Sequence, residues 1–355
     1  MAVALHHVEA AAPPARSGAA DQVPVALGRM LAPLHEALRA SAPASGTRIG
    51  AMSSYHLGWT DAQGRPGRGA SGKFVRGCLA LWAAEQCGGD VASALPAATA
   101  VEWIHNFTLV HDDIQDGDVE RRHRPTVWAV WGSAQAINAG DGMHAIAYRA
   151  LLSGRDRPTA RLRAATAIND AIVAVIEGQC LDLALEGQID TTVTTYLHLA
   201  RAKTGALIGA ALEAGALLGG ADSRRAALLR RAGIEMGIAF QVRDDWLGTW
   251  GDSAVTGKGC GGDLARRKVT YPVVAGHARL RGAAQRHFRR LYRQPGGDED
   301  VILALLDEAR AGEAVADELA RRSRSAMRLA GMCGLSPVAV GDFRSFVDFI
   351  VERAA

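Results

Sequence analysis

The sequence predicts an all-α protein. Apolar positions recur at helical spacing through most of the 355 residues, and runs that alternate apolar and polar residues between turns, the pattern of strands, are nearly absent. Hydrophobic residues form 48% of the chain and charged residues 22%, which is enough apolar material to bury a large core. We find no internal repeat or linker, so we expect one domain over residues 23–355.

The N-terminal part is expected to contain little regular structure. Residues 1–22 are rich in Ala and Pro and lack a basic start followed by an apolar segment. We therefore expect a disordered leader there and not a signal peptide. The glycine-rich stretch from Gly58 to Gly72 predicts a loop.

The clearest helix is expected from about Ala97 to Asp116. Pro96 precedes this segment and Gly117 follows it, and these residues are typical of a helix start and of the position just past a helix end. The expected helix therefore ends on an acid-rich stretch.

Further helices are expected from about Tyr196 to Ala214 and from about Ser223 to Thr249. The β-branched residues Thr191 to Thr195 resemble a strand, but they lead directly into a helical pattern, so we interpret them as a helix start. The segment from Gly251 to Arg267 is expected to be a loop because of its glycine content.

Charge, cysteine and hydropathy patterns exclude several classes of protein. A net charge of +3 without a long basic run disfavours nucleic acid as a partner. The five cysteines are scattered and lack CxxC spacing, which favours a reducing, cytoplasmic location over a disulfide frame or a zinc site. The longest apolar run, from Ala206 to Ala221, is interrupted by Glu213, so no membrane span is expected.

Two aspartate pairs, Asp112-Asp113 and Asp244-Asp245, stand inside apolar, helix-patterned stretches. A carboxylate in an apolar interior costs several kcal/mol unless a cation or hydrogen bonds compensate it. Asp112 and Asp116 are spaced i,i+4 and leave the same face of a helix. Such oxygen-only ligands suit Mg²⁺, which completes its shell with water and phosphates, so phosphate chemistry is the first hypothesis. The alternative is a solvated acidic helix end beside nearby arginines.

Lysine is rare in this chain. It occurs only at Lys73, Lys203, Lys258 and Lys268 among 40 Lys and Arg residues. A chain that otherwise uses arginine can keep lysine where a compact ammonium on a flexible stem is needed, as around a phosphate. Chance in a GC-biased genome is the alternative explanation.

Several motifs together resemble the trans-isoprenyl diphosphate synthase, or polyprenyl synthetase, family over residues 45 to 275. The matching elements are Asp112-Asp113-Ile114-Gln115-Asp116 with Arg121-Arg122 and Arg124-Pro125-Thr126, Gly72-Lys73-Phe74-Val75-Arg76, His105, Gln179 with Asp182, Lys203-Thr204, Phe240-Gln241 before Asp244-Asp245, and Asp263 between Lys258 and Lys268. The resemblance implies the isoprenoid synthase fold, a bundle of about 10 to 14 helices around a central apolar cavity.

The resemblance also implies roles for these residues. Asp112 and Asp116 would hold two Mg²⁺ ions and Asp244 a third, over the diphosphate of an allylic substrate. The other residues implied to bind the allylic diphosphate are Arg121, Lys203 and Lys258. The residues implied to hold isopentenyl diphosphate are Lys73, Arg76, His105 and Arg122. The remaining implied substrate-binding residues are Gln179, Asp182, Thr204, Phe240 and Gln241. The residues implied in catalysis are Asp112, Asp116, Lys203, Asp244 and Gln241.

The chain departs from the family pattern in its second acidic motif. Gly248 replaces the final aspartate, with Asp252 available one turn later. We expect retained activity because the resemblance places metal contact chiefly on Asp244. Phe107 and Thr108 lie one turn before Asp112, where they would form the floor of the pocket for the growing chain. This arrangement resembles short-chain (C15–C20) members of the family, with geranylgeranyl diphosphate favoured, although Phe107 could be ordinary core packing.

Two other functions remain open at this point. A terpene cyclase on the same scaffold would need the metal site but not the site for isopentenyl diphosphate. A regulatory subunit of a heteromeric synthase would need neither. The resemblance further implies a homodimer.

Overall fold

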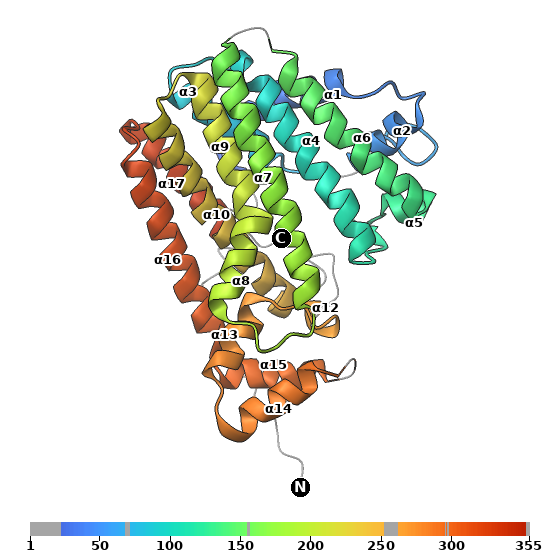
Figure 1. The fold of residues 1–355 in the computed structure, drawn as a ribbon, viewed down its shortest axis with the longest axis vertical. Coiled ribbons are helices and arrows are strands. Elements are labelled where there is room, and N and C mark those ends of the chain that lie inside the picture. Colours follow the sequence, from blue (N-terminus) through green and yellow to red (C-terminus); the bar gives the residue numbers. More distant parts are fainter. Residues whose placement is uncertain are drawn as a thin grey trace.

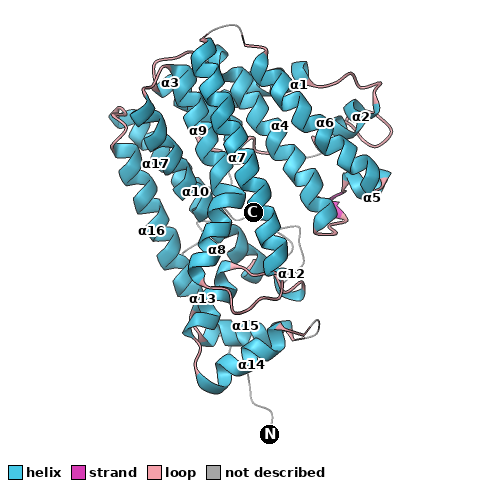
Figure 2. Ribbon diagram, in the orientation of Figure 1, coloured by secondary structure: helices cyan, strands magenta, loops and turns pink. Residues whose placement is uncertain are grey.

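The computed structural model describes residues 23–67, 72–154, 157–251, 262–294, 296 and 298–352. The expected leader over residues 1–22 lies outside these residues, as do Lys258 and Asp252. The all-α prediction is confirmed, because helices form nearly all of the regular structure in the described ranges (Figure 2). None of the helices in these ranges has the length and apolar character needed to cross a membrane.

The helices of the first half are α1 (Val25–Ser41), α2 (Arg48–His56), α3 (Val75–Gln86), α4 (Val91–Gln115), α5 (Val127–Trp131), α6 (Ser133–Leu152) and α7 (Pro158–Leu185). The helices of the second half are α8 (Val193–Ala200), α9 (Ala206–Gly219), α10 (Ser223–Trp250), α12 (Gly262–Ala265), α13 (Tyr271–Arg279), α14 (Gly282–Tyr292), α15 (Glu299–Glu308), α16 (Ala311–Gly331) and α17 (Pro337–Glu352). Two short antiparallel strands, β1 (Glu120–Arg121) and β2 (Arg124–Pro125), pair after α4.

Helix α9 lies at the centre of the bundle. It packs against α3, α4, α7 and α10, and nearly all of its residues are buried (Figure 1). Small residues allow this close packing: a Cβ added at Gly215 would lie 2.0 Å from the carbonyl oxygen of Ala80 on α3. The helix therefore needs glycine at that contact, since the two backbones touch.

Helix α4 is longer than the sequence suggests. It begins at Val91, six residues before the expected start, and Pro96 lies inside it. The Asp90 side chain caps the helix by accepting a hydrogen bond from the Ser93 amide at 2.7 Å. Because Pro96 is near the N-terminus, its missing N–H removes few intrahelical bonds. The expected end is confirmed: the helix stops at Gln115, and Gly117 has a φ of +67°.

The helix predicted from Tyr196 is interrupted by a π-helical turn. The helix start expected within Thr191–Thr195 is confirmed, since α8 begins at Val193 and Thr192 caps it. The chain then passes through the π-helical segment η1 (Arg201–Gly205) into α9. Such turns insert an extra residue and commonly mark functional sites.

The second expected long helix matches α10 closely. It starts at Ser223, with Asp222 as its cap, and ends one residue past the expected Thr249. The predicted loop from Gly251 to Arg267 contains the short helix α12, which sequence periodicity over so few residues could not reveal.

A smaller hydrophobic cluster lies at one end of the molecule, apart from the main core. It is formed mainly by α13, α14 and α15, and Figure 1 shows the last two helices below the long bundle. Its aromatic centre stacks Phe288 on Tyr292, with ring centroids 5.7 Å apart. This cluster borders the segment between α12 and α13, which reaches the acidic end of α4.

Candidate active site

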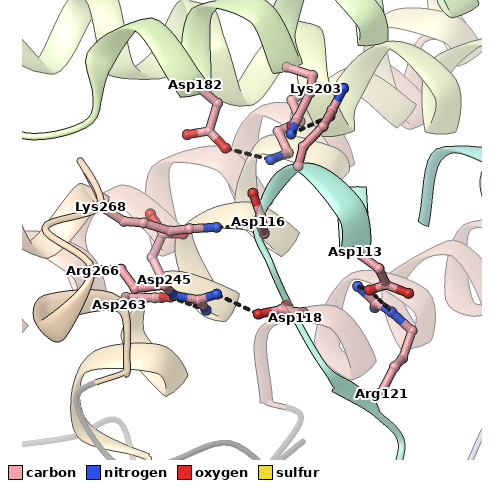
Figure 3. Close-up of polar contacts among 12 residues, drawn as sticks. Asp113, Asp116, Asp118, Arg121, Asp182, Lys203, Asp245, Asp263, Arg266 and Lys268 are labelled. Atoms are coloured by element: carbon pink, nitrogen blue, oxygen red, sulfur yellow. Dashed lines mark hydrogen bonds and ion pairs between the residues drawn. The ribbon is translucent and has the colours of Figure 1, made fainter. Parts of the chain in front are cut away.

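The carboxyl-terminal end of α4 and the neighbouring helices form an acidic cluster with two lysines. Asp116 accepts a hydrogen bond from Nζ of Lys268 at 2.7 Å, and Asp182 on α7 accepts one from Nζ of Lys203 on η1 (Figure 3). Burial opposes ionisation of Asp116, but Lys268 and Lys203 outweigh burial and lower its pKa. The same lysine–acid contacts keep the pKa of Lys203 raised despite its burial. Asp116 and Lys203 are therefore charged near neutral pH.

Asp112 lies in the same electrostatic environment. Burial raises its pKa, and the neighbouring Lys203 acts in the opposite direction. Asp116 and Asp182 raise it further as like charges. The structure thus places Asp112, Asp116, Asp182 and Lys203 close enough to influence one another, as the resemblance implied.

Asp113, the second residue of the first aspartate pair, forms an ion pair with Arg121. Asp113 is buried and accepts a hydrogen bond from Nε of Arg121 at 2.7 Å. Figure 3 shows this ion pair apart from the contacts of Asp116 and Asp182. Burial nevertheless raises the pKa of Asp113 to about 6. Arg121, which the resemblance assigned to the allylic diphosphate, has its hydrogen bonds directed to Asp113 in this structure.

Lys203 and Thr204, which lie in the π-helical segment, contact different neighbouring helices. A Cβ at Gly178 on α7 would lie 2.4 Å from the Lys203 amide nitrogen, so α7 packs directly against this turn. The Thr204 hydroxyl donates to Oε1 of Gln241 on α10 at 2.6 Å. The segment thereby connects the helix that carries Asp182 to the helix that carries the second motif.

Gln179 lies on the same side of α7 but contacts α4. It is buried, and its Nε2 donates to Oε1 of Gln115 at 3.0 Å. Gln179 therefore holds the end of α4 against α7 in this structure.

The two aspartates of the second motif face opposite environments. Asp244 is exposed, whereas Asp245 is buried. The Asp245 carboxyl accepts hydrogen bonds from the Tyr196 hydroxyl at 2.5 Å, the Tyr271 amide at 2.7 Å and Nε2 of Gln241 at 2.9 Å. Burial raises its pKa to about 7, and the three hydrogen bonds oppose that shift. Asp245 therefore joins α8, α10 and α13, which leaves Asp244 as the candidate ligand.

Tyr196 shows that the acids of α7 and α10 lie near each other. Burial raises the pKa of this phenol, and the charges of Asp245, Asp182 and Asp244 raise it further. Since Asp182 is paired with Lys203, the second motif lies beside the acidic cluster of α4. This arrangement agrees with the expectation that the two motifs share one site.

Asp263 lies beside Gly248, the position at which the family pattern has an aspartate. A Cβ built at Gly248 would lie 2.1 Å from Oδ2 of Asp263, a residue of α12. The carboxyl group of Asp263 thus occupies the space next to α10 that a side chain at position 248 would need. Asp263 lies between the downstream lysines in the sequence, and no local pattern predicts its contact with Gly248.

A basic cluster lies further along α4. Nη1 of Arg76 on α3 is 3.1 Å from Nε2 of His105, and the Arg76 guanidinium lies 5.7 Å from the ring centroid of Phe240. Burial and the charges of Arg76 and Arg122 lower the pKa of His105 well below its usual value, so the ring is neutral. Lys73 lies 5.4 Å from the ring centroid of Phe349. Of the four residues that the resemblance assigned to isopentenyl diphosphate, Arg76, Arg122 and His105 therefore lie close together, and Lys73 contacts Phe349.

Arg122 completes the basic cluster in a strained backbone conformation. Its φ is +53°, and a Cβ at Gly72 would lie 2.8 Å from its Nη2, so the guanidinium packs on the Gly72 backbone. Burial lowers the pKa of Arg122, and so does the charge of Arg121. Left-handed non-glycine residues cluster at functional sites.

Two further side chains beside this cluster, Glu102 and His56, were not found from the sequence. Glu102 accepts a hydrogen bond from the Gly77 amide at 2.6 Å, and burial raises its pKa while Arg76 and Arg122 oppose that shift. Burial lowers the pKa of His56 to about 3, with Arg122 and Arg121 contributing. Neither residue belongs to a recognisable motif, and only the tertiary contacts place them here.

The expected floor residues, Phe107 and Thr108, lie one helical turn before Asp112 on α4. Phe107 is 6% exposed, and its ring centroid lies 5.1 Å from that of His144 on α6 and 5.6 Å from that of His111. The Thr108 hydroxyl donates to the carbonyl of His105 and is thus satisfied within α4. Phe107 is therefore the bulkier candidate for limiting chain length.

The donor set suits Mg²⁺. Within the described ranges no group of three or more His, Cys, Asp or Glu side chains converges to form a complete metal cage. Mg²⁺ does not require such a cage, because it is usually held by one or two carboxylates together with water and substrate phosphates. The partly buried, oxygen-only pair Asp112 and Asp116 at the end of α4 fits this description, with Asp244 as a third candidate.

The chain is similar to several known proteins. The sequence profile of the polyprenyl synthetase family matches residues 67–309. The geranylgeranyl diphosphate synthase of Mycobacterium tuberculosis is 47% identical over 247 residues, covering 70% of each chain. The (2E,6E)-farnesyl diphosphate synthase of Mycobacterium bovis is 41% identical over 310 residues, covering 85% of each chain. A polyprenyl synthetase from Streptomyces coelicolor has a similar structure, with a TM-score of 0.85 and 38% identity over 92% of this chain and 98% of its own.

The fold, the motifs and these similarities have one common explanation. The family profile covers more than half of the sequence, and two relatives above 40% identity span most of its length. The chain belongs to the polyprenyl synthetase family of prenyltransferases.

Proposed function

We propose that this enzyme condenses isopentenyl diphosphate with an allylic diphosphate to give a short-chain (C15–C20) trans-prenyl diphosphate, with geranylgeranyl diphosphate favoured, and that it requires Mg²⁺. The observation that carries the proposal is the placement of two differently charged clusters along α4. His105 of the basic cluster and Asp112 of the acidic cluster are seven residues apart, about 10 Å along the helix. Two diphosphates can therefore bind separately with their reacting carbons between them.

The acidic cluster suits the allylic diphosphate. Asp112, Asp116 and Asp244 would hold about three Mg²⁺ ions, which when bound neutralise the diphosphate and make it a better leaving group. Lys203 and Lys268 now neutralise Asp182 and Asp116. If Mg²⁺ were held by Asp116, the ammonium group of Lys268 would be available to the diphosphate oxygens, which gain charge as the allylic C–O bond breaks. Lys203, which contacts Asp182, would add its charge to the same site.

The basic cluster suits the second substrate. Lys73, Arg76 and Arg122 carry charge that a diphosphate would balance, and the neutral His105 donates or accepts a hydrogen bond there. Holding isopentenyl diphosphate at this place sets its double bond beside the allylic cation. Formation of the new C–C bond and loss of a proton complete one five-carbon extension.

We also propose a homodimer in the cytoplasm. Large apolar side chains are exposed along one side of α6 and α7: Ile137, Leu162, Val173, Ile176 and Leu183. An apolar stripe on neighbouring helices is typical of an oligomer interface. The unpaired state of the cysteines at positions 78, 87, 180 and 333 supports a reducing location.

One incubation distinguishes the candidate functions. Purified protein is given Mg²⁺ and farnesyl diphosphate, with and without isopentenyl diphosphate, and products are analysed by chromatography. The proposed synthase forms a longer diphosphate only when both substrates are present. Products from farnesyl diphosphate alone would identify a terpene cyclase, and no product in either mixture would favour a regulatory subunit.

A further inference from the structure

The segment between α12 and α13 contains three consecutive cations that point in two directions. Arg266 pairs with Asp118, and Lys268 pairs with Asp116, both beside the end of α4 (Figure 3). Arg267 lies between them in a left-handed conformation with a φ of +55°. Its side chain is buried and turns away from the acidic cluster towards α14.

The outward-turned arginine fastens this segment to the smaller hydrophobic cluster. Nε of Arg267 donates to the carbonyl of Gln294 at 3.0 Å, and its Nη1 donates to the carbonyl of Leu264 at 2.6 Å. Its guanidinium carbon lies 5.8 Å from the ring centroid of Tyr292. The Arg267 carbonyl accepts a hydrogen bond from the Gly187 amide at 3.1 Å.

Tyr292 holds the backbone of Lys268 directly. Its hydroxyl donates to the Lys268 carbonyl, while its fully buried ring stacks on Phe288 within the smaller cluster. A buried ring of this kind has little freedom to move. The lysine that reaches Asp116 therefore extends from a backbone position that α14 fixes.

We propose that Tyr292 and Arg267 are positioning residues for the allylic diphosphate, acting through Lys268. A lysine side chain is flexible, so a fixed backbone limits the volume that its ammonium group explores. The smaller cluster around α14 and α15 is then a support for the active site and not only an addition to the fold. This inference rests on the proposed function, since it assigns Lys268 to the substrate diphosphate.

Steady-state kinetics of Tyr292→Phe test the inference. The variant keeps the ring and loses only the hydrogen bond to the Lys268 carbonyl. We expect KM for farnesyl diphosphate to rise about fivefold, the effect of one hydrogen bond, with KM for isopentenyl diphosphate unchanged. Ser323→Ala is the matched control, because it also loses a hydroxyl that donates to a backbone carbonyl, that of Leu319 within α16. Its two KM values should equal those of the wild type.

A double variant separates positioning from general structure. In a Lys268→Met background, Tyr292→Phe should add less than about twofold, because the lysine through which it acts is absent. A full fivefold effect in that background, or an equal rise in both KM values, would overturn the inference. Arg267→Asn is a second route to the same result, since Asn tolerates the left-handed conformation but cannot reach Gln294.

Binding of magnesium pyrophosphate provides a readout that does not need turnover. Calorimetry should show about fivefold weaker binding to Tyr292→Phe than to the wild type. If the wild type elongates no substrate, the proposed function fails, and this binding difference still decides the role of Tyr292. Equal affinities in the two proteins would overturn the inference even in an active enzyme.

Discussion

Substitution of Asp245 tests whether this aspartate stabilises the fold while its neighbour Asp244 takes part in the reaction. Its buried carboxyl group accepts three hydrogen bonds, from Tyr196, Tyr271 and Gln241. In Asp245→Ala these three donors lose their acceptor. A buried donor left unsatisfied costs about 1–3 kcal/mol, and entry of water into the vacated space offsets part of the sum. We therefore expect the free energy of unfolding to fall by roughly 3–6 kcal/mol.

Asp245→Asn should behave very differently. One amide oxygen can accept from Tyr196 and Tyr271, and the amide nitrogen can donate to Gln241 if the Gln241 side chain flips. The flipped Gln241 nitrogen would then donate to the Thr204 hydroxyl, so each group keeps a partner. Below about pH 4, where Asp245 is protonated in the folded and unfolded states alike, we expect a change in the free energy of unfolding below about 1 kcal/mol.

Thermal or denaturant unfolding in EDTA measures these effects without bound metal. Asp244→Ala is the neighbouring control, because Asp244 is exposed and its loss should reduce activity more than stability. Equal stability of Asp245→Ala and Asp244→Ala would refute the structural role of Asp245. Equal destabilisation by Asp245→Asn and Asp245→Ala would refute the hydrogen-bond reasoning.

The same residue predicts a pH dependence. Burial raises the pKa of Asp245 from 3.8 to about 7, so the folded protein favours the protonated form. This contribution to stability is present below pH 3.8 and is lost as the pH rises towards 7. The stability of Asp245→Asn relative to the wild type should therefore increase over this pH range, and a constant difference would contradict the assigned shift.

Three further predictions concern product length, the second motif and assembly. Phe107→Ala should lengthen the product by removing a buried ring beside His144, and an unchanged product spectrum on chromatography would refute the floor assignment. Gly248→Asp restores the family's aspartate and should destabilise the protein by about 1–3 kcal/mol, because Asp263 occupies the space beside α10. Urea unfolding measures this loss, and a variant as stable as the wild type would show that Asp263 moves aside. Val173→Asp should convert the proposed dimer to a monomer in light scattering, because it places a charge on the exposed apolar stripe; a wild-type monomer would refute the interface.

Local sequence signals determined the helical class, the catalytic motifs and several helix ends. Apolar periodicity, the glycine after α4 and the caps of α8 and α10 act over a few residues, so the sequence alone could place them. The predicted start of α4 at about Ala97 was wrong, because Asp90 caps the helix and it begins at Val91, before Pro96. The π-helical turn at Lys203 could not be foreseen, since no short sequence pattern distinguishes it from a regular helical turn.

The tertiary structure alone decided which member of each acidic pair is buried. Asp112 and Asp113 are adjacent on α4, and Asp244 and Asp245 are adjacent on α10, so each pair lies in one helical segment. Adjacent residues point about 100° apart, so the face that meets other helices determines which carboxyl group is enclosed and which faces substrate. The pairing of Lys268 with Asp116, 152 positions away, likewise depends on packing of α14 against the segment that carries the lysine. Long-range contacts of this kind leave no local pattern, because the free energy that selects them comes from the assembled core.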